Sequence, residues 1–109
     1  MLIHEATFDD SMAQMAADKR HSTVTQAINS GKSMDARIIV LSHFSARYPV
    51  IDMDISDVSE RLVLAHDGLT LSLNPSRPLP SVDVMLPVME KLLHRSRHED
   101  DTVNYSLIP

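Results

Sequence analysis

The sequence has no cysteine among its 109 residues, which excludes several kinds of site at once. It cannot build a disulfide framework, a cysteine zinc finger or a cysteine nucleophile, so a metal site must use His, Asp or Glu. Glycine is also scarce, and two glycines are too few for a glycine-rich phosphate-binding loop. Two tyrosines and two phenylalanines are its only aromatic residues, which argues against a platform for stacking nucleic-acid bases.

Long hydrophobic runs and positive charge are lacking too. The longest aliphatic run, Ile38–Leu41, is far shorter than the ~20 residues that a membrane-spanning helix needs. No charged segment precedes an apolar stretch, so no signal peptide or other targeting segment is visible, and no membrane partner is expected. The net charge is -5, whereas a domain that binds nucleic acid unaided is usually basic. Any RNA contact would therefore need help from another part of a protein.

The remaining composition is that of an ordinary globular chain, with 43% hydrophobic and 23% charged residues. Its length suits one domain or part of one. The six histidines are the main sign of chemistry, because imidazole binds zinc and carries protons near neutral pH.

The first half of the chain predicts an α/β fold with a parallel sheet. Apolar residues 1–3 and the continuous aliphatic segment 36–42 are typical of strands, the second buried on both faces. Two helices are expected between them. The first ends near residue 20, and the second begins at Thr23, which forms a capping box with Gln26 and precedes a helix end at Gly31. A strand at the very first residue suggests that the chain begins inside a domain.

The second half is less regular. Residues 62–65 and 69–73 are predicted as short strands joined by a hairpin turn at Asp67–Gly68. A last helix is expected from about Pro87 to about Arg97. The predicted division is a domain portion over residues 1–93 and a polar tail over residues 94–109.

Histidines follow both predicted strands of the first half. His4 and Glu5 come after the first strand, His43 comes after the second, and His21 lies between the two helices. Parallel strands end at one edge of their sheet, so these side chains can converge. A lone loop histidine is nevertheless more often an ordinary surface residue. His94 and His98, one helical turn apart, are better explained as dipole-compatible surface residues than as a metal clamp.

Three motifs, in order, resemble a known family. Leu2–Phe8 (LIHEATF), His21–Thr23 (HST) and His43–Tyr48 (HFSARY) are similar to the C-terminal part of ribonuclease Z, also called tRNase Z, of the metallo-β-lactamase superfamily. The likeness is sharp over residues 1–48 and looser to about residue 93, and it favours the long form of the family. It implies that the α/β chain is the C-terminal part of an αββα sandwich.

The resemblance implies an activity and a role for four residues. The family removes 3′ trailers from precursor tRNA by phosphodiester hydrolysis, with two zinc ions that activate water and clamp the scissile phosphate. By position, His43 corresponds to a zinc ligand and His21 to the histidine that protonates the leaving oxygen. Glu5 corresponds to the acidic partner of that histidine, and Arg47 to an arginine near the substrate phosphates.

The departures from the family pattern limit that expectation. The HxHxDH motif that supplies most of the zinc ligands is missing, and one ligand cannot hold a catalytic zinc, which needs about three. The chain is therefore expected to be inactive alone. The expected partners are the missing N-terminal part of the domain or a second copy of the chain, and precursor tRNA is the expected partner of the complete enzyme. A long form implies the nucleus or the mitochondrion. The alternatives are a non-catalytic interaction module and an inert α/β fragment.

Overall fold

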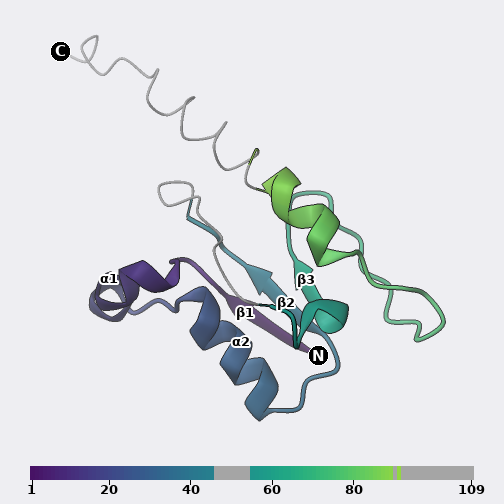
Figure 1. Cartoon of the computed structure of the whole chain (residues 1–109), viewed down its shortest axis with the longest axis horizontal. Helices are drawn as coiled ribbons and strands as arrows, with labels where there is room; N and C mark the ends of the chain where they lie inside the picture. The colour runs from purple at the N-terminus through teal and green to yellow at the C-terminus, as the bar shows by residue number, and fades with distance from the viewer. Residues whose placement is uncertain (46–54, 90, 92–109) are drawn as a thin grey trace, which may run out of the picture.

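Three short parallel strands form the sheet at the centre of the chain (Figure 1). Strands β1 (Leu2–Glu5), β2 (Ile39–Ser42) and β3 (Leu62–Leu64) pair in the order β1-β2-β3, with β2 in the middle. The predicted α/β class with a parallel sheet is confirmed. The structure is a computed structural model that describes residues 1–45, 55–89 and 91.

Two helices connect β1 to β2, as the sequence predicts. A 3₁₀ turn η1 (Asp10–Met12) leads into α1 (Ala13–Lys19), and α2 (Val24–Ser33) follows. The predicted capping box is present: the Thr23 hydroxyl accepts the backbone N–H of Gln26, and the Gln26 side chain accepts the backbone N–H of Thr23. This exchange satisfies two N–H groups that the helix itself cannot pair, so it fixes where α2 begins.

The predicted helix end at Gly31 is wrong, because α2 continues through Gly31 to Ser33. The glycine has a packing role instead. A Cβ atom at this position would lie 2.5 Å from Cδ1 of Ile39, which is fully buried in β2. The missing side chain therefore lets α2 approach the sheet closely, and this tertiary contact overrides the local preference of glycine for a helix end.

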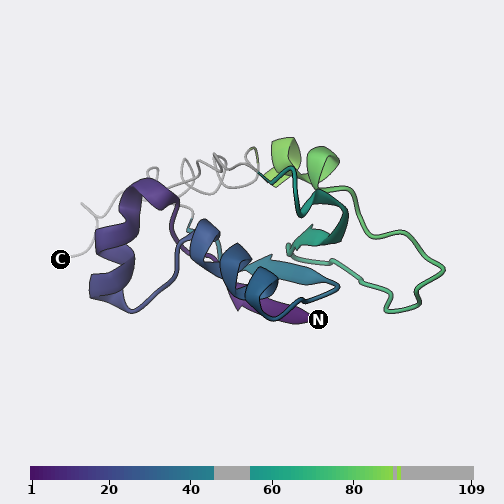
Figure 2. The same cartoon turned by 60° about the horizontal axis from the view of Figure 1, so that its bottom comes forward.

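The core lies between the sheet and the helices that cover one of its faces (Figure 2). Strand residues Ile39, Leu41, Leu62 and Leu64 alternate with neighbours that point to the other face. They belong to one buried cluster with apolar residues of α2 and of the helical segment 82–89. Both faces of β2 are buried, which explains its continuous aliphatic sequence. Val40, between Ile39 and Leu41 and on the opposite face, is only 5% exposed.

The second half of the chain departs from the sequence prediction. A 3₁₀ turn η2 (Ser59–Arg61) precedes β3, but residues 69–73 form no strand, and β3 pairs in parallel with β2 rather than in a hairpin. Gly68 does adopt the positive φ of 82° expected of a turn glycine. Asp67–Gly68 therefore forms the predicted turn, but no second strand follows it in residues 69–73.

The last described helix begins at residue 82, ahead of the predicted start at Pro87. Its predicted end and the polar tail 94–109 lie outside the described residues. Within the part of the chain that the structure describes, no helix is long and apolar enough to cross a membrane.

Candidate catalytic site

The carboxyl ends of β1 and β2 bring two of the predicted site residues to one edge of the sheet. Glu5 is the last residue of β1 and lies opposite Ser42, the residue before His43. Beyond the strands, Ala6 N donates to the Ser42 carbonyl at 2.8 Å, and Ser45 N donates to the Thr7 carbonyl at 3.1 Å. These bonds keep the two chain segments side by side after the sheet ends. The expected convergence of Glu5 and His43 at this edge is therefore observed.

His21 reaches the same edge because the turn between α1 and α2 pairs with the end of β1. Arg20 ends α1 in a left-handed conformation, with φ of 60°, and His21 N donates to the Ala16 carbonyl at 2.8 Å. Phe8 then forms an isolated parallel bridge with Thr23 and exchanges backbone hydrogen bonds with the residues on either side of it. These backbone hydrogen bonds place His21 next to Glu5 at the end of β1.

Glu5 is held as a carboxylate by three hydrogen-bond donors. Its Oε2 accepts the Thr7 N–H at 3.1 Å and the Thr7 hydroxyl at 2.6 Å, and its Oε1 accepts the Ser22 N–H. Burial acts to raise the pKa of Glu5, but the hydrogen bonds from Thr7 and Ser22 together outweigh burial and lower the pKa below its usual value of 4.5. Glu5 is therefore ionised at neutral pH and faces His21 as a negative charge.

The Thr7 hydroxyl lies between Glu5 and the ring of His21. His21 Nδ1 is 3.2 Å from Thr7 Oγ1 and 3.5 Å from Glu5 Oε2. The single hydroxyl proton of Thr7 goes to the carboxylate at the shorter distance, so the oxygen accepts from His21. This arrangement assigns a proton to Nδ1 of His21 and leaves Nε2 to face a reacting group.

His43 lies against the other side of His21. The two imidazole rings are stacked, with centroids 5.5 Å apart and an angle of 28° between planes, while Phe8 packs edge-on against His21 at 6.0 Å. His43 also has a positive φ of 60° directly after β2. This backbone region is uncommon for residues other than glycine, and such outliers concentrate at functional sites. The rings of His21 and His43 thus lie face to face at the end of β2.

The other sequence candidates are not part of this cluster. The Nδ1 atom of His4 donates to the Glu5 carbonyl at 2.7 Å instead. His66 similarly donates to the carbonyl of Asp67 at 2.9 Å. Arg47, His94 and His98 lie outside the described residues.

Sequence reasoning missed Thr7 and Ser22 as contributors to the cluster. Thr7 supplies two of the three hydrogen bonds to Glu5, and Ser22 supplies the third from its backbone. A signal for Thr7 was present, because a hydroxyl two residues after a carboxylate is well placed to bond with it locally. No sequence pattern reveals the Ser22 contact, which joins residues from two separate turns.

The described residues do not by themselves fit a zinc site. Within residues 1–45, 55–89 and 91, no three His, Asp or Glu side chains are grouped so that they could hold a metal ion. A catalytic zinc has about three protein ligands. His43 could supply one of them, and the remaining ligands would have to come from elsewhere.

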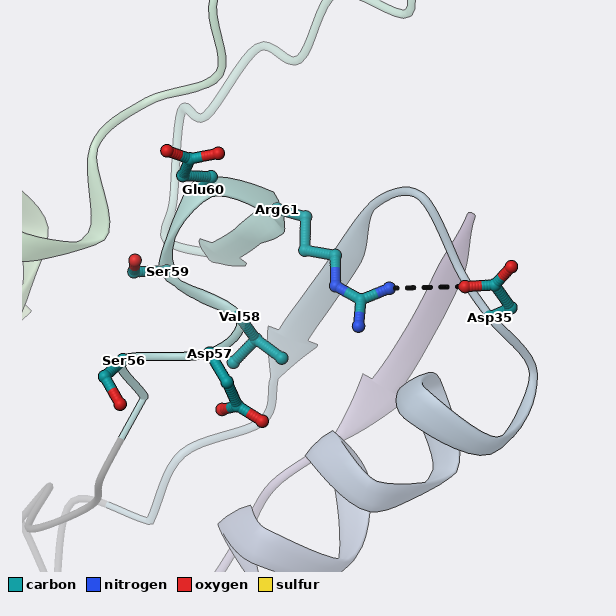
Figure 3. A pocket seen from close by; sticks show the side chains of 7 residues that line it. All are labelled: Asp35, Ser56, Asp57, Val58, Ser59, Glu60 and Arg61. Atoms are coloured by element: carbon teal, nitrogen blue, oxygen red, sulfur yellow. Dashed lines mark ion pairs between the residues drawn. The ribbon is translucent and has the colours of Figure 1, made fainter.

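Two surface cavities of the described chain lie away from this cluster, at the amino end of the sheet. The larger, of about 650 Å³, is lined by residues 56–61 and Asp35 (Figure 3). Its one guanidinium is already engaged, since Arg61 donates to the Ala36 carbonyl at 2.8 Å and lies 3.9 Å from Asp35. The cluster of Glu5, His21 and His43 lies outside both cavities, with Glu5 and His21 half-buried and His43 exposed.

Comparison with known proteins identifies relatives of the chain. It is 44% identical over 75 residues to Ribonuclease Z 1 of Schizosaccharomyces pombe, which covers 68% of this chain and 9% of that protein. It is 38% identical over 92 residues to Zinc phosphodiesterase ELAC protein 2 of Mus musculus, which covers 84% of this chain and 11% of that protein. The chain therefore spans about a tenth of the length of these relatives.

A solved structure agrees with the sequence comparison. The crystal structure of a long form RNase Z from yeast superimposes with a TM-score of 0.59 and 25% identity, over 94% of this chain and 13% of that one. No protein-family model matches the chain.

Proposed function

The chain is homologous to a small part of the long-form ribonuclease Z proteins, and on that premise we propose that it carries part of the catalytic apparatus of a tRNA 3′-processing endoribonuclease. The αββα sandwich of the metallo-β-lactamase superfamily is the proposed complete fold, of which the three parallel strands are one portion. The observation that supports this proposal most is the placement of His21 between the Thr7–Glu5 pair and the ring of His43.

In the proposed reaction, the oxygen of a water molecule forms a bond to the phosphorus of the phosphodiester between the tRNA and its 3′ trailer, and the water releases one proton to the solvent. The bond between the phosphorus and the leaving oxygen breaks. Protonated His21 gives a proton from Nε2 to that oxygen. Glu5 stabilises the imidazolium, because its lowered pKa keeps it negative, and Thr7 fixes the orientation of the ring. General acid catalysis of this kind contributes about 10²- to 10⁴-fold.

His43 is proposed as one zinc ligand of the complete site and Arg47 as a contact to the substrate phosphates. Zinc in such a site activates water and neutralises charge on the phosphate. The further ligands are proposed to come from the N-terminal part of the domain that the relatives contain. It follows that the isolated chain should be inactive, or nearly so, towards precursor tRNA. The nuclear or mitochondrial location stays a prediction.

The test is a chimaera that provides the missing part. The segment of S. pombe Ribonuclease Z 1 that aligns with this chain is replaced by this chain, and cleavage of a 3′-extended precursor tRNA is measured. The chimaera should cleave, and His21→Ala should lower kcat by about 10²-fold or more. His66→Ala is the matched control, because the ring of His66 is hydrogen-bonded to the neighbouring Asp67 carbonyl and is not part of the cluster of Glu5, His21 and His43. Equal activity of the His21→Ala and His66→Ala chimaeras would contradict the assigned role.

One observation favours the alternative of an interaction module. The outer edge of β1 has no partner strand among the described residues, and Ile3 in that strand is 63% exposed. Unpaired edges with apolar side chains tend to associate. A mass that rises with concentration in sedimentation equilibrium would support self-association through this edge, and Ile3→Lys should then abolish the rise. A constant monomer mass would argue against it.

A further inference from the structure

A second surface cavity, of about 420 Å³, lies at the end of the sheet opposite His21 and His43. Its walls come from the residues that precede β1 and β2 and from the irregular segment 72–79. Because parallel strands begin at one edge and end at the other, this cavity is separated from the histidine cluster by the length of the strands. The residues that line it are Met1, Arg37, Ile38, Ser72, Leu73, Asn74, Pro75, Arg77 and Leu79.

Two arginines line this cavity and no carboxylate does. Within the part of the chain that the structure describes, neither the Arg37 nor the Arg77 guanidinium has an ion pair or a hydrogen bond. The larger cavity is different, because its arginine already contacts a carbonyl and a carboxylate. Both guanidinium groups of the smaller cavity are therefore available to an anion, in a chain whose net charge is -5.

Neutral polar groups of the same cavity are also placed to donate. The Asn74 side-chain oxygen accepts the Ser76 N–H at 2.9 Å, so the side-chain amide N–H groups of Asn74 can donate to a ligand. The Ser72 hydroxyl oxygen accepts the Asn74 N–H at 3.3 Å, so its own proton is available. Together with the arginines, these donors match the several acceptor atoms of a carboxylate or a phosphate.

The rest of the lining is apolar. Leu73 is 64% exposed, so its side chain offers apolar surface to a ligand in the cavity. The volume falls within the range of about 300–1,000 Å³ that is typical of small-molecule sites. A ligand that fills such a cavity has an apolar body as well as an anionic group.

We propose that this cavity binds a small organic anion whose carboxylate or phosphate group contacts Arg37 and Arg77 and whose apolar body lies against Met1, Ile38, Leu73 and Leu79. This site goes beyond the proposed tRNA processing and does not depend on it. A nucleic-acid strand fits less well, because no aromatic residue lines the cavity for base stacking and two cations are few for a polyanion.

The test is titration of the ¹⁵N-labelled chain, followed by NMR, with octanoate, octyl phosphate and neutral octyl glucoside, each kept below its micelle-forming concentration. Saturable shifts at the Arg37 and Arg77 side chains and at the Leu73 amide are expected with one or both anions and not with the glucoside. Comparison of octanoate with octyl phosphate distinguishes the carboxylate from the phosphate.

The variants make the test specific. Both arginines are exposed, so the double variant Arg37→Gln/Arg77→Gln should fold, which circular dichroism checks. It should bind the preferred anion about 10- to 100-fold more weakly, because hydrogen bonds to charged groups are lost. Lys19→Gln removes an exposed charge at the far end of α1 and should leave affinity unchanged.

Three results would overturn the proposal. The first is the absence of saturable binding of either anion at millimolar concentration. The second is equal weakening by Lys19→Gln, which would indicate non-specific attraction. The third is tighter, arginine-dependent binding of a single-stranded oligouridylate than of octyl phosphate, which would make the cavity a nucleic-acid contact instead.

Discussion

Replacing Thr7 by valine removes one hydroxyl group and leaves the shape of the side chain almost unchanged. That hydroxyl donates to Glu5 Oε2 at 2.6 Å and accepts from His21 Nδ1 at 3.2 Å. A hydrogen bond to a charged group contributes about 1.5–3 kcal/mol, and a neutral one about 0.5–1.5 kcal/mol. Because the Glu5 side chain is 31% exposed, water compensates part of the loss, and the expected decrease in the free energy of unfolding is about 1–3 kcal/mol.

Stability alone would not show that Thr7 orients the histidine, so the decisive readout is the tautomer of His21. Long-range ¹H–¹⁵N NMR spectra of the ¹⁵N-histidine-labelled chain at slightly alkaline pH report which ring nitrogen carries the proton. We expect the proton on Nδ1 in the wild type and in Thr7→Ser, which keeps the hydroxyl. In Thr7→Val it should move towards Nε2, the nitrogen that a free histidine side chain prefers.

Thr7→Val also changes how stability depends on pH. The folded pKa of Glu5 lies below its unfolded value of 4.5, so ionised Glu5 stabilises the folded chain above about pH 4.5, and this contribution is lost as the pH falls through the folded pKa. Without the Thr7 hydroxyl the folded pKa should rise, and the acid-side loss of stability should become smaller. Urea unfolding at several pH values measures this change.

One result would refute the reasoning outright. If His21 keeps its proton on Nδ1 in Thr7→Val, the hydroxyl is not its partner, and the direct contact to Glu5 at 3.5 Å is sufficient. If Thr7→Ser shifted the proton as far as Thr7→Val does, the hydroxyl would not be what holds it, since the serine retains that oxygen.

Other variants test the packing, the helix cap and the backbone at the site. Gly31→Ala places a methyl group against Ile39 and should lower the free energy of unfolding in urea by about 1–3 kcal/mol. The control Asn29→Ala, on the exposed side of α2, should change that free energy by less than about 0.5 kcal/mol. Thr23→Ala removes the helix cap and should cost about 0.5–2 kcal/mol, with a loss of helical signal in circular dichroism. His43→Gly should be more stable than His43→Ala by about 1–2 kcal/mol, because glycine tolerates the positive φ without strain; equal stabilities would show that the backbone is unstrained there.

Local signals in the sequence predicted the first half of the fold well. The capping box at Thr23 needs only residues three apart, and the aliphatic segment before His43 carries its own evidence of burial. The prediction failed where a distant contact decides the outcome. Gly31 is helical because α2 must approach Ile39, and residues 69–73 are not a strand although their composition permits one. Neither fact can be read from neighbouring residues.

The candidate site shows the same division. The closeness of Glu5 and His43 was predictable, because Glu5 ends one parallel strand, His43 follows the next, and the carboxyl ends of such strands meet at one edge. The roles proposed for His21 and Glu5 came from the resemblance of motifs. The structure adds Thr7, whose hydroxyl group is hydrogen-bonded to both side chains. That partner was not predictable, because its role depends on the turn after α1 folding back onto the end of β1.

The distance between the cluster of Glu5, His21 and His43 and the cavity lined by Arg37 and Arg77 determines whether a ligand at one can affect the other. Each of β1 and β2 has four residues, so at about 3.3 Å per residue the two edges of the sheet are roughly 13 Å apart. An anion bound at Arg37 and Arg77 is then too far away to contact His21, and between them lies a sheet in whose central strand Ile39, Val40 and Leu41 are buried. Octyl phosphate should therefore leave the His21 ring resonances unchanged while it shifts those of the arginines. Coupled shifts at both ends would mean that the sheet, or α2 packed against it, moves when the anion binds.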